Sequence, residues 1–467
     1  MVRALGDYFS GGGLRLGVTG LSRSGKTVFL TALINNLTAG ARLPVLAASA
    51  EGRLTRARLD PQPDDAVPRF AYEEHLASLS GTDRRWPQST RRIAQLRLTI
   101  EFESASAWGG RGSSLELDLV DYPGEWLLDL PLLDKTYAEW SRETLGVSES
   151  PARAPLSAKW RDALAGLDPH AGADEETARR LAELFTAYLR RARDDVYALS
   201  TLPPGRFLMP GDLEGSPALT FAPIPLAEDN AIGAGTMAAM MERRYEAYKT
   251  HVVRPFFRDH FARLDRQIVL VDALTALNSG PAALNDLENA LVNVLSAFRA
   301  GRASRLASIF RPRIDRVLFA ATKADHLHHT SHDRLEAILR ALTSKAIARA
   351  EGVGAEIDVI AMAAIRATRE ARIRQGAETL EAIIGVPEAG ETLGGQRFDG
   401  SVEVAVFPGE LPADPRSIFE GDAIALSEAD NDWRFLRFRP PSAARGQPAP
   451  HIRLDRALQF LIGDRLA

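Results

Sequence analysis

Two stretches in which apolar and polar residues strictly alternate predict a pair of half-buried strands near the start of the chain. The alternation runs through residues 96–103 and again through 115–119, where leucines are separated by acidic residues. Successive side chains of a strand point to opposite faces, so each stretch indicates one buried and one solvated face. The polar connection between them contains Gly109-Gly110 and suits a hairpin.

Unbroken apolar runs predict a second kind of strand, one that is buried on both faces. Such runs are typical of parallel strands in a sheet covered by helices. Between them, apolar residues fall at helical spacing. Strands that alternate with helices indicate βαβ units, so the sequence predicts an α/β fold with a mostly parallel sheet. The expected strands cover 16–19, 268–272, 317–321 and 357–362, and the expected helices cover 28–37, 284–298 and 333–351.

Helical periodicity without a clear strand fills the middle of the chain. Two amphipathic stripes stand out, over residues 181–189 and 245–261, and the second is interrupted near Pro255. Aromatic stripes of this kind are more often core than ligand site. The Pro- and Gly-rich residues between them, 201–233, are expected to form a loop.

The tail of the chain predicts a small β/α extension. Alternation near residues 402–406 and 436–438 indicates two strands, either at a sheet edge or in a small β-subdomain, and a last helix follows over 454–462. The expected division is a discontinuous core of 1–125 and 266–395, a helical insertion domain of 126–265, and C-terminal strands and a helix of 396–467 that pack on the core.

The composition says more about the expected location and partners of the protein than about its chemistry. The net charge of −4 gives no reason to expect nucleic acid or an anionic membrane surface as a partner. The absence of cysteine excludes disulfides and fits a reducing compartment. No stretch approaches the roughly 18 apolar residues that span a bilayer, and the first residues lack the apolar centre of a signal peptide. We expect a cytoplasmic protein with at most peripheral membrane association.

Residues 20–27 carry the clearest chemistry, because they read G-x-x-x-x-G-K-T between an expected strand and an expected helix. Backbone N–H groups, a helix N-terminus and the Lys26 ammonium together suit a polyphosphate, and the Thr27 hydroxyl suits Mg²⁺. An ordinary glycine-rich turn is the disfavoured alternative. The candidate phosphate-binding residues are Gly20, Ser22, Arg23, Ser24, Gly25, Lys26, Thr27 and Val28.

A second motif, Asp121-Tyr122-Pro123-Gly124, follows the second alternating strand. Asp121 would hold Mg²⁺ through its water shell, and the Gly124 N–H would reach a γ-phosphate together with Lys26. Ras-type GTPases often place a glutamine next, where this chain has Glu125. Glu125 either polarises the attacking water or caps the following helix. Arg23 contacts the γ-phosphate or a switch loop, or points to solvent.

A third motif, Thr322-Lys323-Ala324-Asp325, matches the [NT]-K-x-D pattern of guanine-nucleotide sites. The Asp325 carboxylate can accept hydrogen bonds from N1–H and N2–H₂ of guanine, a pairing that adenine cannot make. After the next expected strand, a backbone N–H of Ala364 or Ile365 is placed to meet the guanine O6.

Two further features lie in polar loops. Residues 41–92 occupy the place of a nucleotide-sensing switch, and Thr90 is the candidate that closes over Mg²⁺ and the γ-phosphate, although a solvated threonine is an equal alternative. The histidines His326, His328, His329 and His332 suggest a metal, but their irregular spacing favours a solvated loop.

The chain resembles the YcjX-like (DUF463) family of bacterial P-loop proteins in segments spread over almost its whole length. The resemblance implies a P-loop NTPase fold with a Ras-like GTPase core and a helical insertion. It also implies binding of GTP and GDP with Mg²⁺, and a link to stress responses. The matching segments are VTGLSRSGKTVFLTALINNL, LVDYPGEWLLDLPLL, RQIVLVDALTALNSGP, TKADHLH, AIRATRE and PHIRLDRALQFLIGDRL.

Together these features predict a guanine-nucleotide switch that hydrolyses GTP slowly. The helical insertion, which follows Gly124 directly, would relay the nucleotide state to a protein partner that the sequence does not identify. Two alternatives stay open at this point: a P-loop enzyme that uses ATP, and an interaction scaffold that nucleotide stabilises without turnover.

Overall fold

The computed structural model divides into two compact units. The first unit comprises Met1–Tyr122, Leu264–Pro281 and Arg313–Ala467, and the second comprises Pro123–Arg263 and Ala282–Pro312. The domain limits expected from the sequence stay a prediction. The structure describes residues 13–20, 23–81, 83–88, 92–105, 112–194, 197–226, 232–299, 314–351, 355–375, 378–393, 395–419, 435–442 and 447–467.

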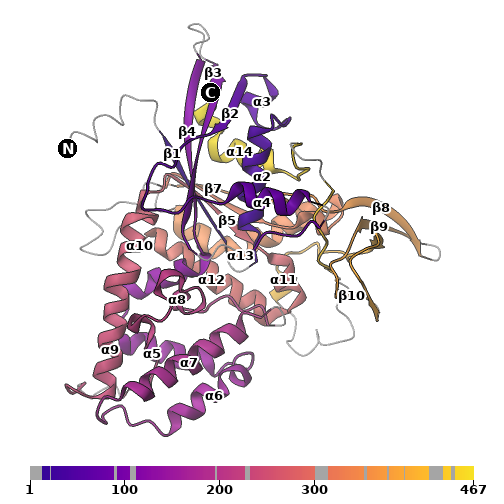
Figure 1. The fold of residues 1–467 in the computed structure, drawn as a ribbon. Helices are drawn as coiled ribbons and strands as arrows, with labels where there is room; N and C mark the ends of the chain where they lie inside the picture. Colours follow the sequence, from indigo (N-terminus) through magenta and orange to yellow (C-terminus); the bar gives the residue numbers. More distant parts are fainter. Residues whose placement is uncertain are drawn as a thin grey trace. The chain divides into compact units, whose positions relative to one another are not determined.

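A seven-stranded sheet in the order β2-β3-β4-β1-β5-β6-β7 forms the centre of the first unit (Figure 1). Strands β4, β1, β5, β6 and β7 run parallel, while β2, β3 and β4 pair antiparallel. The predicted α/β class with a mostly parallel sheet is therefore confirmed. The strands are β1 (Leu14–Gly20), β2 (Leu54–Leu59), β3 (Ala94–Glu103), β4 (Gly112–Asp121), β5 (Arg266–Val271), β6 (Arg316–Ala321) and β7 (Glu356–Ala361).

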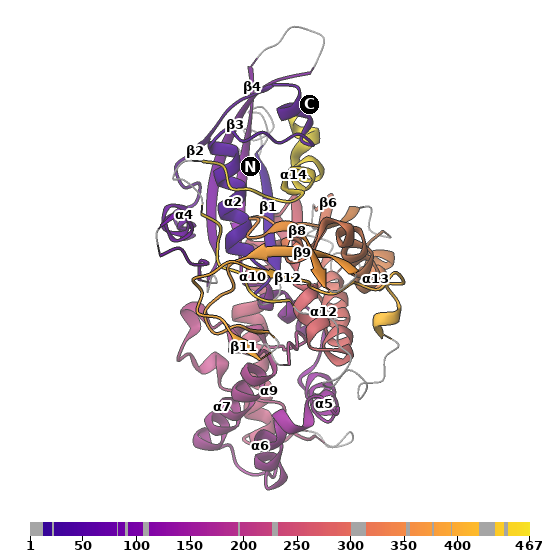
Figure 2. The ribbon, with the colours of Figure 1, turned by 90° about the vertical axis from the view of Figure 1, so that its right-hand side faces the viewer.

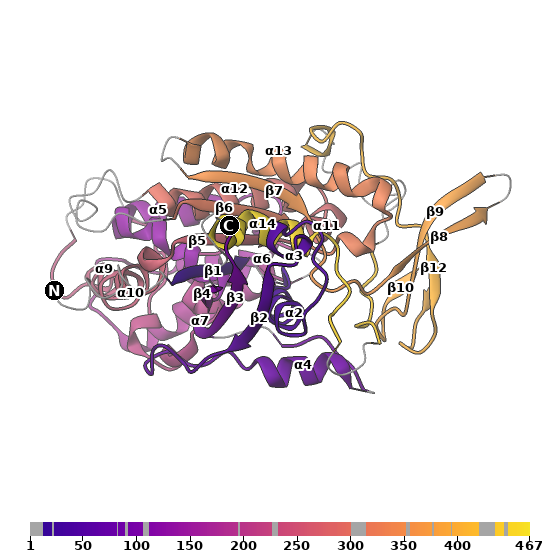
Figure 3. The ribbon, with the colours of Figure 1, turned by 90° about the horizontal axis from the view of Figure 1, so that it is seen from above.

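Helices cover this sheet as the βαβ pattern predicts. Helices α2 (Lys26–Thr38), α4 (Tyr72–Ser80) and α14 (Leu454–Ile462) share one apolar cluster with strand residues. Helix α13 (His332–Glu351) packs on β6 and β7. Seen from above, α13 lies at the β7 end of the sheet and α4 at the β2 end (Figure 3). Short helices α3 (Ala47–Ala50) and α11 (Ala273–Asn278) complete the helices described in this unit.

The edge strand β2 was not expected, because its sequence has no apolar alternation. Its residues 54–59 read Leu-Thr-Arg-Ala-Arg-Leu, and none of them is fully buried. β2 lies at the edge of the sheet, where it pairs only with β3 and buries little apolar surface. β2 is a strand because it forms hydrogen bonds with β3, and the periodicity of the sequence does not indicate such hydrogen bonds.

A second, smaller sheet in the order β12-β9-β8 was only partly expected (Figure 2). Its strands are β8 (Arg369–Gln375), β9 (Glu378–Gly385) and β12 (Val404–Val406), and β10 (Thr392–Leu393) pairs with β11 (Gln396–Arg397) beside it. The strand near 402–406 is confirmed, whereas residues 436–438 form one isolated bridge through Phe438. β8 and β9 escaped prediction because charged residues occupy both of their faces.

The second unit is helical in its described residues and holds an aromatic core. Trp140 stacks on Tyr245 with ring centroids 5.1 Å apart, and Trp160 stacks on Tyr188 at 5.8 Å. Phe185 contacts both tryptophans, so the two expected stripes meet as core. The helices are α5 (Tyr137–Ser148), α6 (Ala154–Ala165), α7 (Glu175–Ala192), α8 (Gly205–Leu208), α9 (Met237–Tyr248), α10 (Arg254–Asp259) and α12 (Pro281–Arg299).

The interruption expected near Pro255 takes the form of a helix junction. A π-helical turn, Lys249–Val253, joins α9 to α10, and Pro255 lies in the first turn of α10. A proline is tolerated there because the N–H groups of the first turn have no partner within their own helix.

The C-terminal helix is tied to the sheet by a buried arginine. Arg266, at the start of β5, is only 1% exposed. Its guanidinium donates to Asp464 at 2.5 and 2.6 Å and to the Leu461 carbonyl at 2.6 Å, and Nε donates to Asp315 at 3.1 Å. The bidentate pair satisfies a cation that would otherwise be costly to bury.

We expect the substitution Arg266→Met to destabilise the first unit by about 3 kcal/mol, the low end of the range for a broken buried ion pair. The low end applies because Asp464 and Asp315 stay in partial contact with water. The midpoint of chemical denaturation measures the change. Arg258→Met is the matched control, since Arg258 pairs with Asp259 on the surface. Equal midpoints for both variants would contradict this account.

Candidate functional site

The glycine-rich loop between β1 and α2 favours glycine at two positions, one because of close packing and the other because of its backbone conformation. A Cβ added to Gly20 would lie 2.1 Å from Ser24 Oγ and 2.6 Å from the Leu270 carbonyl oxygen. Gly25 has φ of 84°, in the left-handed region that favours glycine. Lys26 follows at the start of the helix, and its Nζ donates to the Gly20 carbonyl at 2.9 Å. The loop therefore closes on itself around the lysine.

The N-terminus of α2 has the features of an anion site. Gly25 is the N-cap residue and offers no side-chain cap, and the first turn contains no acidic residue. The first N–H groups of a helix lack partners within it and carry partial positive charge. The hydroxyl of Ser24 is buried and makes no hydrogen bond within the described part of the chain. These donors suit phosphate oxygens.

Asp121 lies at the same edge of the sheet as the glycine-rich loop. Strands β4 and β1 are parallel, and their register pairs Asp121 with Val18, two residues before Gly20. The side chain of Asp121 is buried. Carboxyl ends of parallel strands share one edge, so a carboxylate and a phosphate loop are brought together there.

The Thr322–Asp325 motif forms a sharply bent turn after β6. Lys323 has φ of 61°, a left-handed conformation that is uncommon for a residue other than glycine. Its Nζ donates to Asp272, whose carboxylate also accepts from the Thr275 N–H at 3.1 Å. Burial opposes ionisation of Asp272, but the Lys323 charge and these hydrogen bonds outweigh it, so the pKa of Asp272 lies below its ordinary value. Lys323 is thus held in place by charge.

The Asp325 carboxylate is held by the chain that follows β7. Its Oδ2 accepts the Ala367 N–H at 2.8 Å, and the hydroxyl of Thr368 donates to the Asp325 carbonyl. Asp325 is 4% exposed, so these bonds orient a buried anion. Ala364 and Ile365 precede this contact, between Ala363 and Arg366, whose N–H groups bond to the chain at 450–452.

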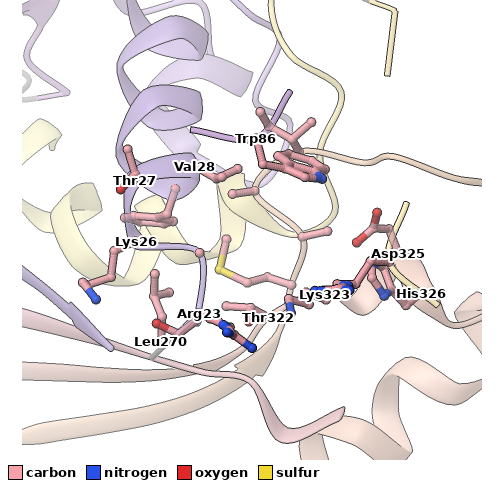
Figure 4. Close-up of a pocket in the computed structure, with 18 of the residues that line it drawn as sticks. Arg23, Lys26, Thr27, Val28, Trp86, Leu270, Thr322, Lys323, Asp325 and His326 are labelled. Atoms are coloured by element: carbon pink, nitrogen blue, oxygen red, sulfur yellow. The ribbon is translucent and has the colours of Figure 1, made fainter. Parts of the chain in front are cut away.

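One cavity of about 260 Å³ brings most of the expected site residues together. Figure 4 shows Lys26 and Thr27 at one side of this cavity and Asp325 and His326 at the other. The expected residues that line it are Arg23, Ser24, Gly25, Lys26, Thr27, Val28, Thr322, Lys323, Asp325, Ala364 and Ile365.

The cavity is also lined by residues outside the phosphate and base motifs, among them Trp86, His326, Glu388, Arg437 and Phe438. Trp86 Nε1 donates to the Phe438 carbonyl at 2.7 Å, and the Glu388 N–H donates to the Arg437 carbonyl at 2.8 Å. Burial raises the pKa of Glu388 against the opposing charge of Arg437. These residues come from four separate segments of the chain, and neither the phosphate motif nor the base motif includes them.

The remaining expected residues lie elsewhere. Gly124 and Glu125 begin the second unit. There the Glu125 carboxylate is buried and pairs with Arg193 at 3.3 Å. Ser22 and Thr90 lie outside the described residues. Gln88, the last described residue before Thr90, has its carbonyl oxygen 3.5 Å from Thr27 Oγ1.

The structure corrects the expectation that the histidines after the base motif lie in a solvated loop. The spacing favoured a solvated loop, yet His326, His328 and His332 are buried, and only His329 of the four is exposed. His332 Nε2 lies 2.8 Å from the Ala324 carbonyl oxygen. The loop packs against the small sheet and the cavity wall, a tertiary contact that spacing does not reveal.

A family model described as "YcjX-like family, DUF463" matches residues 14–466. The chain belongs to the YcjX-like family. The resemblance expected from the sequence is therefore confirmed over nearly the whole chain.

Two curated relatives carry the name "Ras-like GTPase YcjX". The one from Escherichia coli (strain K12) is 42% identical over 465 residues, which cover 97% of this chain and 96% of the relative. The one from Shewanella oneidensis is 35% identical over 486 residues, covering 97% and 94%. Within the described residues, no helix is both long and apolar enough to cross a bilayer.

We expect the first unit to lose stability in acid because of His326. Burial lowers the pKa of this histidine below its ordinary value of 6.5, against the opposing charge of Asp325. The unfolded chain therefore takes up a proton that the folded chain does not. Stability from this group is complete above about pH 6.5 and falls as the pH drops toward the folded pKa, by at most about 1.4 kcal/mol per pH unit.

Denaturation midpoints at pH 7.5 and 5.5 test this expectation. His326→Gln should lose less stability between the two pH values than the wild type does. The control His170→Gln, which changes an exposed histidine, should behave as the wild type. If the His326 variant shows the same pH dependence as the wild type, the histidine is not the cause.

Proposed function

We propose that the protein binds GTP and GDP with Mg²⁺ in this cavity and hydrolyses GTP slowly, as a molecular switch. One observation carries the proposal: the glycine-rich phosphate loop and the Thr322–Asp325 base motif line the same cavity. The names of the two relatives agree with it. A purine nucleoside triphosphate has its phosphates and its base at opposite ends, as this cavity has its two motifs.

Guanine specificity would come from Asp325. Its buried carboxylate can accept two hydrogen bonds from the N1–H and N2–H₂ edge of guanine, whereas adenine presents no such pair of donors. The Ala367 N–H already orients the carboxylate. Ala364 and Ile365 line the same cavity, which supports a backbone N–H there as the partner of O6.

Lys26, Lys323 and Arg23 supply positive charge along the cavity. When phosphate binds, the Lys26 ammonium would donate to phosphate oxygens in place of the Gly20 carbonyl. The charged phosphate is the stronger hydrogen-bond partner. The remaining donors are backbone N–H groups at the start of α2 and the hydroxyl of Ser24. The stem of Lys323, held by Asp272, would lie along the base.

The residues at the phosphate end fit Mg²⁺, which prefers oxygen ligands and keeps part of its water shell. Thr27 would ligate the ion with its hydroxyl, Asp121 would hold it through water, and Thr90 would close over it. When bound, Mg²⁺ neutralises charge that develops on the β- and γ-phosphates. Hydrolysis breaks the bond between the γ-phosphorus and the bridging oxygen as water attacks, and yields GDP and phosphate.

We propose that three residues assist hydrolysis, and Lys26 has the most support among them. Lys26 would stabilise charge on the phosphates, and the Gly124 N–H would meet the γ-phosphate. For Glu125 to orient the attacking water, its carboxylate would have to accept a hydrogen bond from that water while it also pairs with Arg193. The slow hydrolysis that we propose agrees with a carboxylate committed to an ion pair.

The switch would act through segments whose contacts already converge on the phosphate loop. The chain at 83–88 touches Thr27 through Gln88 and the C-terminal segment through Trp86 and Arg84, whose Nε donates to the Pro440 carbonyl at 2.7 Å. Binding of a γ-phosphate would order this segment together with Thr90 and Gly124. We propose that the helical insertion 126–265 passes the change to a protein partner in a cytoplasmic stress response.

Asp325→Asn provides the test of base recognition. The amide donates where the carboxylate accepts, so we expect GTP affinity to fall by about 100-fold or more and xanthosine triphosphate to become the better ligand. Titration calorimetry of both nucleotides measures the exchange.

Two controls accompany this variant. Asp333→Asn removes a carboxylate on the surface of α13 and should leave GTP preferred. Lys26→Ala should abolish binding of both nucleotides, because it removes the phosphate contact without altering the base contact. An Asp325→Asn protein that still prefers GTP would contradict the assignment of the base site.

A further inference from the structure

Two histidines and two glutamates converge beside the base motif. His328 and His329 lie between the base motif and α13, Glu370 lies on β8, and Glu381 lies on β9. His329 Nδ1 lies 2.8 Å from Glu370 Oε2, while His328 Nε2 lies 3.8 Å from that oxygen and 3.0 Å from Glu381 Oε2. Ligand atoms of His328, His329 and Glu370 all lie within 4.8 Å of one another.

These separations differ from those of ligands around one ion by amounts that small side-chain shifts can close. Zinc binds nitrogen and oxygen at about 2.0–2.2 Å in tetrahedral geometry, which places neighbouring ligand atoms roughly 3.3–3.5 Å apart. The three measured separations, 2.8, 3.0 and 3.8 Å, lie on both sides of that value. Small side-chain rotations would equalise them.

The other polar atoms of these side chains make contacts that orient the candidate ligand atoms toward one another. The second nitrogen of His328, Nδ1, lies 3.0 Å from Thr330 Oγ1, so its other nitrogen is the one that faces the glutamates. Arg366 lies 3.5 Å from Glu370 Oε1, and Arg372 donates to Glu381 Oε1 at 3.1 Å. Glu370 thus has Oε2 facing the histidines, while Glu381 Oε2 faces His328 and also accepts from Arg372 Nε at 3.4 Å. Such outer partners are typical of metal-bound histidine and carboxylate.

Protonated histidines would pair with these glutamates as well, and this is the competing explanation. It accounts for His329 and Glu370 as one surface pair. It explains His328 less well, because two carboxylates approach the same buried nitrogen and a single N–H bonds well to only one of them. A divalent cation at the point where the atoms converge satisfies both carboxylates.

We propose that His328, His329 and Glu370 form a binding site for a divalent transition-metal ion of the Zn²⁺ type, and that Glu381, 3.0 Å from His328, turns toward the ion as a fourth ligand. Two imidazoles and two carboxylates suit zinc better than Mg²⁺, which prefers oxygen alone. The site is separate from the nucleotide cavity, since none of the four side chains lines it. A neighbouring hollow of about 240 Å³, lined by His328, Glu381 and Arg334 among others, gives the ion access.

The ion would clasp the segment after the base motif to the β8–β9 hairpin. Asp325 and Thr368 already connect the same two segments by a hydrogen bond. A metal bond across them would stiffen the turn that carries Asp325, and binding to the folded chain alone would raise its stability. The site thus makes metal a structural support of the base end of the cavity.

Zinc content after gel filtration tests the proposal on the full chain, without a polyhistidine tag and without nucleotide. The wild type, equilibrated with excess Zn²⁺, should retain about one zinc per chain by elemental analysis, and its melting temperature should rise with zinc. His329→Ala and Glu370→Gln should each lower zinc affinity by about 100-fold or more, in line with the loss of a ligand. His170→Ala changes an exposed histidine of the second unit and should retain zinc as the wild type does.

His329→Ala is the informative variant, because this side chain is exposed and its removal is expected to cost little stability. Melting without zinc verifies that the variants are folded. If the wild type retains no zinc, or if His329→Ala and Glu370→Gln retain as much as His170→Ala, the proposal is overturned. Zinc bound at the phosphate loop instead would be retained equally by the site variants and by the His170→Ala control. That outcome would also overturn the proposal.

Discussion

The close approach of Gly20 to Ser24 and Leu270 is the constraint on which the candidate site depends. No side chain fits at Gly20, so the chain leaves β1 and turns directly into α2 with the helix N-terminus facing the cavity. Parallel pairing then sets Leu270 and Asp121 at the same edge, because β5 and β4 run beside β1 in fixed register. The base motif follows β6, the next parallel strand. One tight turn thus determines where the proposed phosphate, metal and base contacts can meet.

Much of this could be predicted because the signals are local. The phosphate loop, Asp121 and the base motif each follow a strand whose apolar pattern is clear, and parallel strands bring their carboxyl ends together. The strands β3 and β4 were recognisable because apolar residues fill one face of each, while the other face is mostly polar, although part of it is buried as well. The last helix was recognisable because its apolar residues recur on the side that joins the main core.

What could not be predicted depends on contacts between distant segments. β2, β8 and β9 are strands because a neighbour accepts their hydrogen bonds, and their charged sequences do not indicate it. The cavity wall formed by Trp86 and Phe438 joins residues 352 positions apart. The same holds for His328, which looks solvated in the sequence and is buried by residues of the small sheet. Burial of this kind belongs to the tertiary fold and has no period along the chain.

The central claim is that this cavity selects guanine nucleotide through a buried carboxylate beside a phosphate loop. The affinities of GTP, GDP and ATP, measured side by side by calorimetry in the presence of Mg²⁺, test it most directly. We expect both guanine nucleotides to bind at least about 100-fold more tightly than ATP, because adenine leaves the Asp325 carboxylate unpaired. ATP binding as tight as that of GTP would contradict the account.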